Sequence, residues 1–163
     1  PGVKAMRRGL RLAFFSVEEW ALTGSARYVE GLNEAERDAI ALNVNLDSIG
    51  GSARLAALTS GFAGLEPFLI RTAEGAGHAL RCVRPLLVNS DHANFAKAGI
   101  PAFRLVAGYD DPGAHLRLVL TSGDTRDKVA RAELGSAAAL THAIAAAACE
   151  ASPEEAARWR ARM

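Results

Sequence analysis

The sequence predicts an α/β fold, a three-layer sandwich in which helices flank a mostly parallel mixed sheet. Two observations support this prediction. Short apolar segments typical of buried strands alternate along the chain with segments of helical periodicity. Half of the 163 residues are hydrophobic, which is enough to build one core without disulfides. No repeat or linker divides the chain, so residues 1–163 are expected to form a single domain.

The first expected elements are a strand and a helix joined by a charged loop. Residues 10–15 are apolar and aromatic, as in a strand buried on both faces, and the carboxylates Glu18 and Glu19 follow them. Residues 23–32 then show helical spacing behind a Thr or Ser that can cap the helix.

In the next segment apolar and polar residues alternate. This pattern in residues 40–49 predicts a strand with one polar face, and Gly50 ends it. Residues 55–58 form a weaker strand candidate. Residues 64–73 are expected to form a helix that is broken or bent around Pro67.

A third strand, a short helix and a fourth strand follow. Residues 80–88 are expected to form a strand at the sheet edge, or one ending at Pro85, because proline cannot donate to the ladder. A helix over 91–98 stops at Gly99, and a strand over 102–106 follows directly.

The last part of the chain is dominated by helix. Turn residues precede an apolar run over 116–120, and a long helix with an apolar stripe is expected over about 125–149. The tail, 152–163, alternates Glu and Arg and is expected to be a solvated helix or a fraying end.

Charge and cysteine content exclude several classes of function. Lys and Arg number 19 against 18 Asp and Glu, so neither nucleic acid nor an anionic membrane is an expected partner. Cys82 and Cys149 have no Cys-x-x-Cys spacing, which argues against a zinc knuckle or a redox pair. No apolar stretch approaches the roughly 20 residues of a membrane span. The chain opens abruptly at Pro1, so its compartment is left open and a missing upstream segment is the favoured interpretation.

Polar residues at strand ends are the candidates for chemistry, because ligands bind at the carboxyl ends of strands in open α/β sheets. The pair Glu18 and Glu19 follows the first expected strand, and Asp47 ends the alternating one. Residues 89–92 begin the short helix. Each group has a plainer interpretation: solvated carboxylates, an Asx cap, and ordinary helix capping with His92 as a surface imidazole.

Taken in order, these segments resemble the co-catalytic di-zinc aminopeptidases, metallopeptidase family twenty-eight. Residues 14–29 resemble its aromatic-x-x-x-Glu-Glu-x-x-Leu-x-Gly-Ser-x-x-Tyr signature, and 45–50 resemble its Asn-Leu-Asp-x-x-Gly segment. Residues 90–101 are similar to its Ser-Asp-His-x-x-Phe-x-x-x-Gly-Ile-Pro stretch. Residues 124–129 are similar to the Asp-Thr-x-Asp-Lys-Val that opens its last long helix.

This resemblance implies a zinc-exopeptidase-like fold, of which the chain is the C-terminal portion, and a site with two zinc ions. It makes Glu18 the general base, Glu19 a ligand of one zinc and Asp47 a ligand of the other. It also places three residues along the crevice, where they contact the ligands or a peptide or small amide substrate: Ser90, Asp91 and His92.

The resemblance fails at the remaining zinc ligands. The His of a His-x-Asp motif and the Asp of a Gly-x-x-Asp-Asn segment normally precede the Glu-Glu pair, and neither stands upstream of Glu18 here. The last ligand is normally a His four residues before the Asp-Thr pair, where this chain has Leu120. Either His92 or His115 supplies an imidazole instead, or the site binds metal poorly or singly. His78 and His142 are expected to be structural, and a loop position is expected for His115.

The sequence therefore favours a zinc-dependent exopeptidase of the aminopeptidase type with an incomplete metal site. Two alternatives stay open. One is a peptidase-like domain used for binding or dimerisation without catalysis, and the other is a related zinc hydrolase of small amide or N-acyl bonds. Association into a homo-oligomer is also left open.

Overall fold

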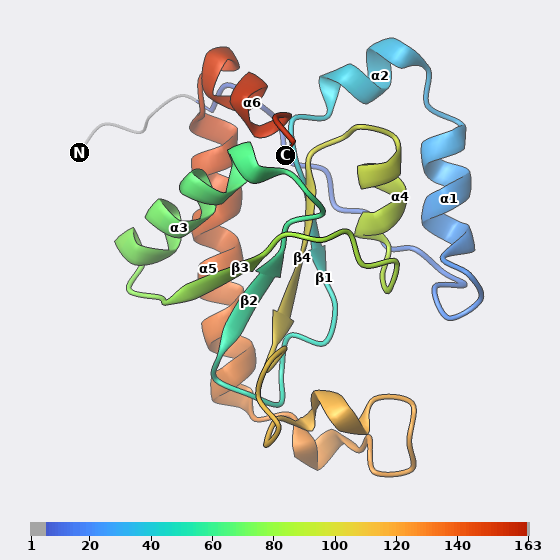
Figure 1. Cartoon of the computed structure of the whole chain (residues 1–163), viewed down its shortest axis with the longest axis vertical. Coiled ribbons are helices and arrows are strands. Elements are labelled where there is room, and N and C mark those ends of the chain that lie inside the picture. The colour runs from blue at the N-terminus through green and yellow to red at the C-terminus, as the bar shows by residue number, and fades with distance from the viewer. Residues whose placement is uncertain (1–5, 163) are drawn as a thin grey trace.

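The structure is a computed structural model that describes residues 6–162, and its layers are visible in Figure 1. Three short 3-10 helices, η1 (Ala63–Leu65), η2 (His115–Leu118) and η3 (Arg126–Lys128), supplement the main elements. In chain order the main elements are α1 (Thr23–Glu30), α2 (Glu34–Ala39), β1 (Asn43–Leu46), β2 (Leu55–Leu58), α3 (Glu66–Gly75), β3 (Leu80–Val83), α4 (His92–Lys97), β4 (Ala102–Ala107), α5 (Arg131–Glu150) and α6 (Pro153–Trp159).

The strands form one mixed sheet in the order β1-β4-β2-β3. β1 is parallel to β4 and β2 is parallel to β3, whereas β2 runs antiparallel to β4. The carboxyl ends of β1 and β4 therefore share one rim with the amino ends of β2 and β3. The expected α/β class with a mostly parallel mixed sheet is confirmed.

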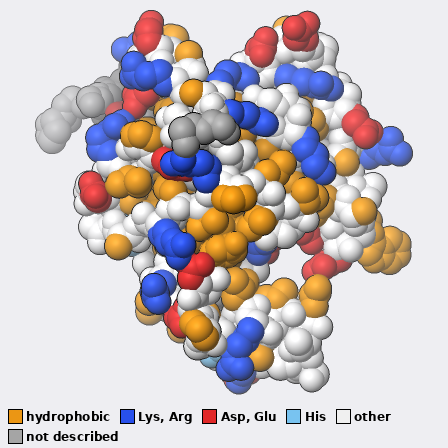
Figure 2. Space-filling view, viewed as in Figure 1, with side chains coloured by type: hydrophobic (Ala, Val, Ile, Leu, Met, Phe, Trp, Pro, Cys, Tyr) orange, Lys and Arg blue, Asp and Glu red, His pale blue; other side chains and the backbone are white. Residues whose placement is uncertain are grey.

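Helices cover the sheet from two sides. In Figure 1, α3, α5 and α6 gather to the left of the strands, and α1, α2 and α4 lie to the right. Successive side chains of β4 point to opposite faces of the sheet. Phe103 and Leu105 are fully buried in the main core, which also contains Leu140 and Ile144 of α5. Figure 2 shows Lys and Arg interspersed with Asp and Glu on the visible face, around apolar side chains at its centre.

Two helices differ from expectation for reasons of local chemistry. α2 is absent from the sequence prediction, yet it has a full capping box: the Asn33 side chain accepts from the Glu36 amide, and the Glu36 carboxylate accepts from the Asn33 amide. The bend expected at Pro67 is wrong. Pro67 stands in the first turn of α3, where its missing N–H costs nothing and its fixed φ favours the helix.

The strand expected at 10–15 is wrong. Leu12 is 75% exposed and Phe14 is 94% exposed, and only Phe15 turns inward, with its ring centroid 5.5 Å from that of Tyr28 and 6.0 Å from that of Phe95. A strand needs a hydrogen-bonded neighbour, and within residues 6–162 no strand pairs with this segment.

The end of the chain also departs from the sequence prediction. The run over 116–120 contributes to η2 rather than to a strand, and the last long helix begins at Arg131, after η3. Residues 152–162 contain the expected helix, α6. One face of it is buried through Ala156 and Trp159, whereas its Glu154 and Arg158 side chains are exposed to solvent.

Helix α5 is long and apolar enough, with a mean hydropathy of 1.2, to meet the length and composition criterion for a membrane span. The expectation that no stretch approaches the length of a membrane span is therefore corrected. Its buried residues, which include Ala137, Leu140 and Ile144, belong to the main core, and they make up 22% of the apolar window.

Candidate functional site

A tight loop before α1 carries Glu18 and Glu19. Val17 and Leu22 have φ of 60° and 57°, so the chain turns sharply on both sides of the pair, and the Leu22 amide donates to the Glu18 carbonyl at 2.9 Å. Gly24 allows the loop to fold back onto α1, because a Cβ there would collide with the Ser16 carbonyl oxygen. The loop thus fixes the backbone of Glu18 beside the first turn of α1.

Asp47 follows β1 directly, at the rim where β1 and β4 end. Ser48, with φ of 55°, follows it in the left-handed region, and its carbonyl oxygen accepts from the amide of Ala107 at the end of β4 at 2.9 Å. The register places Asn45 of β1 opposite Arg104 of β4. The Arg104 side chain can therefore reach along the strands to the residues that follow β1.

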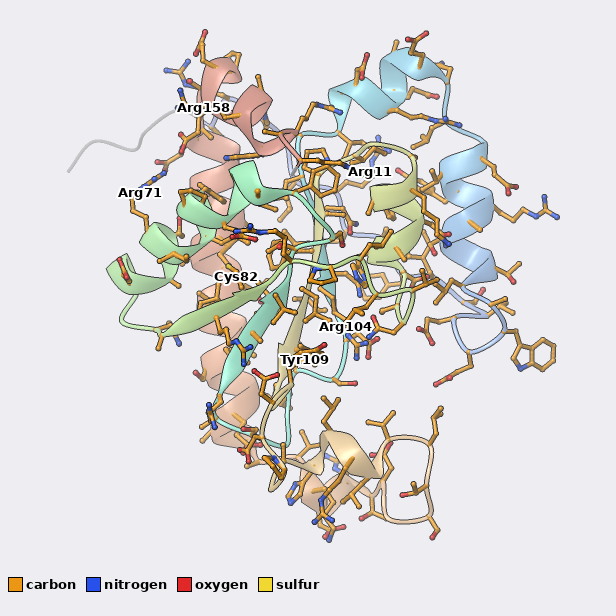
Figure 3. All side chains as sticks on the ribbon, in the orientation of Figure 1. Arg11, Arg71, Cys82, Arg104, Tyr109 and Arg158 are labelled. Atoms are coloured by element: carbon orange, nitrogen blue, oxygen red, sulfur yellow. The ribbon has the colours of Figure 1, made fainter. Side chains whose placement is uncertain are left out.

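Arg104 is a buried cation at this rim, and the sequence analysis missed it. Its guanidinium donates to the Asn89 carbonyl at 2.9 Å, to Ser48 Oγ at 3.1 Å and to the Asp47 carbonyl at 3.3 Å. Arg104 Nη2 also lies 3.3 Å from Asp47 Oδ2, and the residue is only 7% exposed. Figure 3 labels Arg104 beside the sheet. The only signal in the sequence was one charge within the otherwise apolar strand 102–107.

The Glu18 carboxylate lies within electrostatic range of the other acidic residues of the site. Burial raises the pKa of Glu18 above its ordinary value, and the negative charges of Asp47, Glu19 and Asp91 raise it further, while Arg104 acts in the opposite direction. Glu19 is exposed. The structure thus brings Glu18, Asp47, Asp91 and Arg104 into one neighbourhood, with Glu19 at its outer side.

Ser90 and Asp91 tie the site together rather than cap α4 through their side chains. The Asp91 carboxylate accepts a hydrogen bond from the buried Ser25 hydroxyl, which in turn accepts from Asn94 Nδ2 at 2.8 Å. The Ser90 hydroxyl accepts from Asn45 Nδ2 at 2.7 Å. These bonds hold the start of α4 against both α1 and β1.

His92 is fully buried, so its interpretation as a surface imidazole is wrong. Neither ring nitrogen has a hydrogen-bond partner of good geometry among residues 6–162. Burial and, to a smaller extent, the charge of Arg104 lower the pKa of His92 to about 4, against the opposing influence of Asp47 and the Ser90 backbone. The side chain is therefore a neutral imidazole behind the rim.

These residues fit a zinc site only in part. Carboxylate oxygens of Glu18, Glu19 and Asp47 and a neutral imidazole are all zinc ligands by type. However, among residues 6–162 no group of three or more His, Cys, Asp or Glu side chains is arranged to hold a metal ion. Leu120 is 77% exposed and offers no ligand atom. A complete site needs donors beyond those that the structure describes.

His115 is not the exposed loop residue that the sequence indicated. It begins η2, is half-buried, and its Nδ1 lies 2.6 Å from the Lys128 carbonyl oxygen. Its Cβ also packs so close to Gly51 that a side chain at that glycine would collide with it. This contact ties the 112–130 segment to the loop after β1.

Comparison with known proteins also indicates a peptidase family. The model of peptidase family M28 matches residues 2–146. No curated protein matches the chain.

Three solved structures share the fold. The zinc aminopeptidase BSAP from Bacillus subtilis is 26% identical with a TM-score of 0.71, covering 80% of this chain and 34% of that one. The aminopeptidase from Aneurinibacillus sp. strain AM-1 is 25% identical with a TM-score of 0.69, covering 82% and 32%. The LapA aminopeptidase of Legionella pneumophila, at 21% identity and a TM-score of 0.66 over 85% and 38%, shows likeness of fold alone.

The chain thus spans about a third of the length of the solved structures that it resembles. The family model covers most of this chain, with the rim residues Glu18, Asp47, Asp91 and Arg104 inside the matched segment. The chain belongs to peptidase family M28.

Proposed function

We propose that the chain contributes the general base and part of the metal ligands to a zinc-dependent aminopeptidase. The observation that supports this most is the electrostatic proximity of Glu18 to Asp47, which come from separate segments and meet at one rim of the sheet. Similarity to zinc aminopeptidases agrees with it.

Glu18 is the proposed base because its environment suits proton transfer. A carboxylate whose pKa is raised by burial and neighbouring charges holds a proton more tightly than an exposed one, so it accepts a proton from the attacking water more readily. It can then pass that proton to the leaving amine.

Glu19 and Asp47 are the proposed zinc ligands. When bound, zinc would polarise the scissile carbonyl and lower the pKa of the attacking water. Asp47 is held through its backbone carbonyl and carboxylate by Arg104, so its position is fixed without any ion. Ser90, Asp91 and His92 are proposed to keep the start of α4 in place beside these ligands and to border the substrate. The remaining ligands would have to come from outside the residues that the structure describes.

The test is Glu18→Gln in the longest natural form of the protein. Hydrolysis of an aminoacyl anilide is expected to fall by at least about 100-fold, because general-base catalysis contributes that much, while zinc content stays unchanged. Glu34→Gln, at an exposed position in the first turn of α2, serves as the control. Loss of zinc together with activity would contradict the role of Glu18 as a base.

A peptidase-like domain without catalysis is the second candidate, favoured by Leu120 in place of the expected His. It predicts neither bound zinc at neutral pH nor hydrolysis of aminoacyl anilides by the same protein. Hydrolysis of N-acyl amino acids but not of aminoacyl anilides would instead indicate the related amide hydrolase.

A further inference from the structure

The two-ion site that the family resemblance implies conflicts with the charge at the rim of this chain. A guanidinium already occupies the neighbourhood of Asp47, with Arg104 Nη2 3.3 Å from Asp47 Oδ2. We propose that Arg104 takes the place of one divalent cation, so that the site accepts at most a single metal ion. This inference rests on the proposed zinc-dependent function.

The fixed position of Arg104 is the first step of the argument. Three acceptors besides the Asp47 carboxylate receive its N–H groups: the carbonyl oxygens of Asn89 and Asp47, and the Ser48 hydroxyl. A side chain that is 7% exposed and bonded to both the end of β1 and the loop before α4 does not swing out into solvent. The guanidinium is therefore a permanent part of the rim.

Its charge is the second step. A buried guanidinium stays protonated and needs acidic partners, which Asp47 provides directly and Glu18 provides at longer range. The same two carboxylates would have to neutralise a second metal ion. Arg104 and a divalent ion carry charge of the same sign and repel each other. In addition, carboxylates that already neutralise Arg104 are less available to neutralise a metal ion.

Leu120 supplies the third, independent step. It stands where the resemblance expects the imidazole ligand, and its side chain is 77% exposed and has no donor atom. Loss of that ligand and gain of a fixed cation both lower the affinity for a second ion. Together they give one metal ion and one guanidinium instead of two metal ions.

The test measures zinc stoichiometry by equilibrium dialysis and elemental analysis on the longest natural form of the protein. The wild type, Leu120→His and Arg104→Lys are each expected to bind one zinc ion per chain, because a fixed cation remains beside Asp47. Arg104→Met combined with Leu120→His is expected to bind two. Circular dichroism and melting curves identify variants that fail to fold, and Arg104→Gln replaces Arg104→Met in the double variant if the latter does not fold.

Two zinc ions on the wild type would overturn the inference, and so would a folded double variant that still binds one. Hydrolysis by a wild type with two ions would leave the proposed function standing while the inference fails. If the wild type binds no zinc, the proposed function fails. In that case, zinc binding by the double variant would still support the inference that Arg104 takes the place of a metal ion. A double variant that also binds no zinc would refute that inference.

Discussion

The indole of Trp159 packs against the ring of Phe68, with 4.5 Å between the ring centroids and 40° between the ring planes. The contact joins α6 at the end of the chain to α3 beside the sheet. η1 also packs closely against the end of α6, because a Cβ at Gly64 would collide with the Arg158 carbonyl oxygen. The final segment is thus part of the core rather than an appendage.

Replacing Trp159 with alanine is expected to lower the free energy of unfolding by about 3–5 kcal/mol, since it removes a fully buried aromatic side chain and leaves a cavity. Urea unfolding followed by circular dichroism measures the change. The exposed neighbour Arg158, replaced with alanine, should cost no more than about 0.5 kcal/mol. Equal losses for the two variants would mean that α6 is not docked as described.

Ser25→Ala is expected to destabilise the chain by about 1–3 kcal/mol, because it removes the donor to the buried Asp91 carboxylate. It also removes one of the two acceptors of Asn94 Nδ2, which keeps its hydrogen bond to the Leu22 carbonyl. The exposed Ser122, changed in the same way, provides the matched control. Thermal or urea unfolding at neutral pH is suitable for both. If Ser25→Ala behaves like the control, the link between α1 and α4 does not contribute to stability.

Glu66→Gln should lower the melting temperature in a pH-dependent way. The Glu66 carboxylate accepts two hydrogen bonds from Arg84, at 2.9 and 2.8 Å, and this pairing holds the pKa of Glu66 below its ordinary value of 4.5. A lowered folded-state pKa means stability that is present above that ordinary value and lost as the pH falls through the folded-state value.

The melting temperatures of wild type and Glu66→Gln should therefore differ at pH 7 and converge as the pH falls below the ordinary pKa of 4.5 and through the lowered folded-state pKa of Glu66. Glu74→Gln, at an exposed position on the same helix, is the control and should leave the wild-type melting temperature nearly unchanged at pH 7. A difference between wild type and Glu66→Gln that persists undiminished in acid would show that the charge of Glu66 is not its source.

The Cys82 thiol should resist alkylation in the folded chain. Burial first, and then the negative charge of Glu66, raise its pKa to about 12, so at pH 8 its thiolate is about a thousandfold scarcer than that of a thiol with a pKa of 9.0. Iodoacetamide labelling of a Cys149→Ser variant, followed by mass spectrometry with and without urea, tests this. Equal labelling rates in the folded and unfolded states would contradict it.

Local patterns in the sequence predicted the elements that depend on local forces. The alternation in 40–49 predicted β1, and the apolar run with Gly99 and Pro101 predicted β4 after a short helix. The Asn33 and Glu36 capping box was a legible signal for α2 that the sequence analysis did not use. Boundaries were less accurate, because strand ends depend on pairing partners.

Long-range features could not be predicted in the same way. Residues 10–15 have the composition of a buried strand, but a strand also needs a neighbour in register. The role of Arg104 follows only from its pairing opposite Asn45, and Trp159 could be placed only once α3 was known to lie beneath it. Glu18 and Asp47 were singled out from the sequence, whereas Arg104, the cation beside Asp47, was not.

The order of the strands has one last consequence. β1 forms a border of the sheet among the described residues, so its outward amide and carbonyl groups are a template for one more extended segment. A segment that joined there in parallel would have its carboxyl end at the rim where β1 ends and Asp47 follows. An engineered peptide that paired with β1 along this border could thus bring additional metal-ligating side chains to the acidic rim.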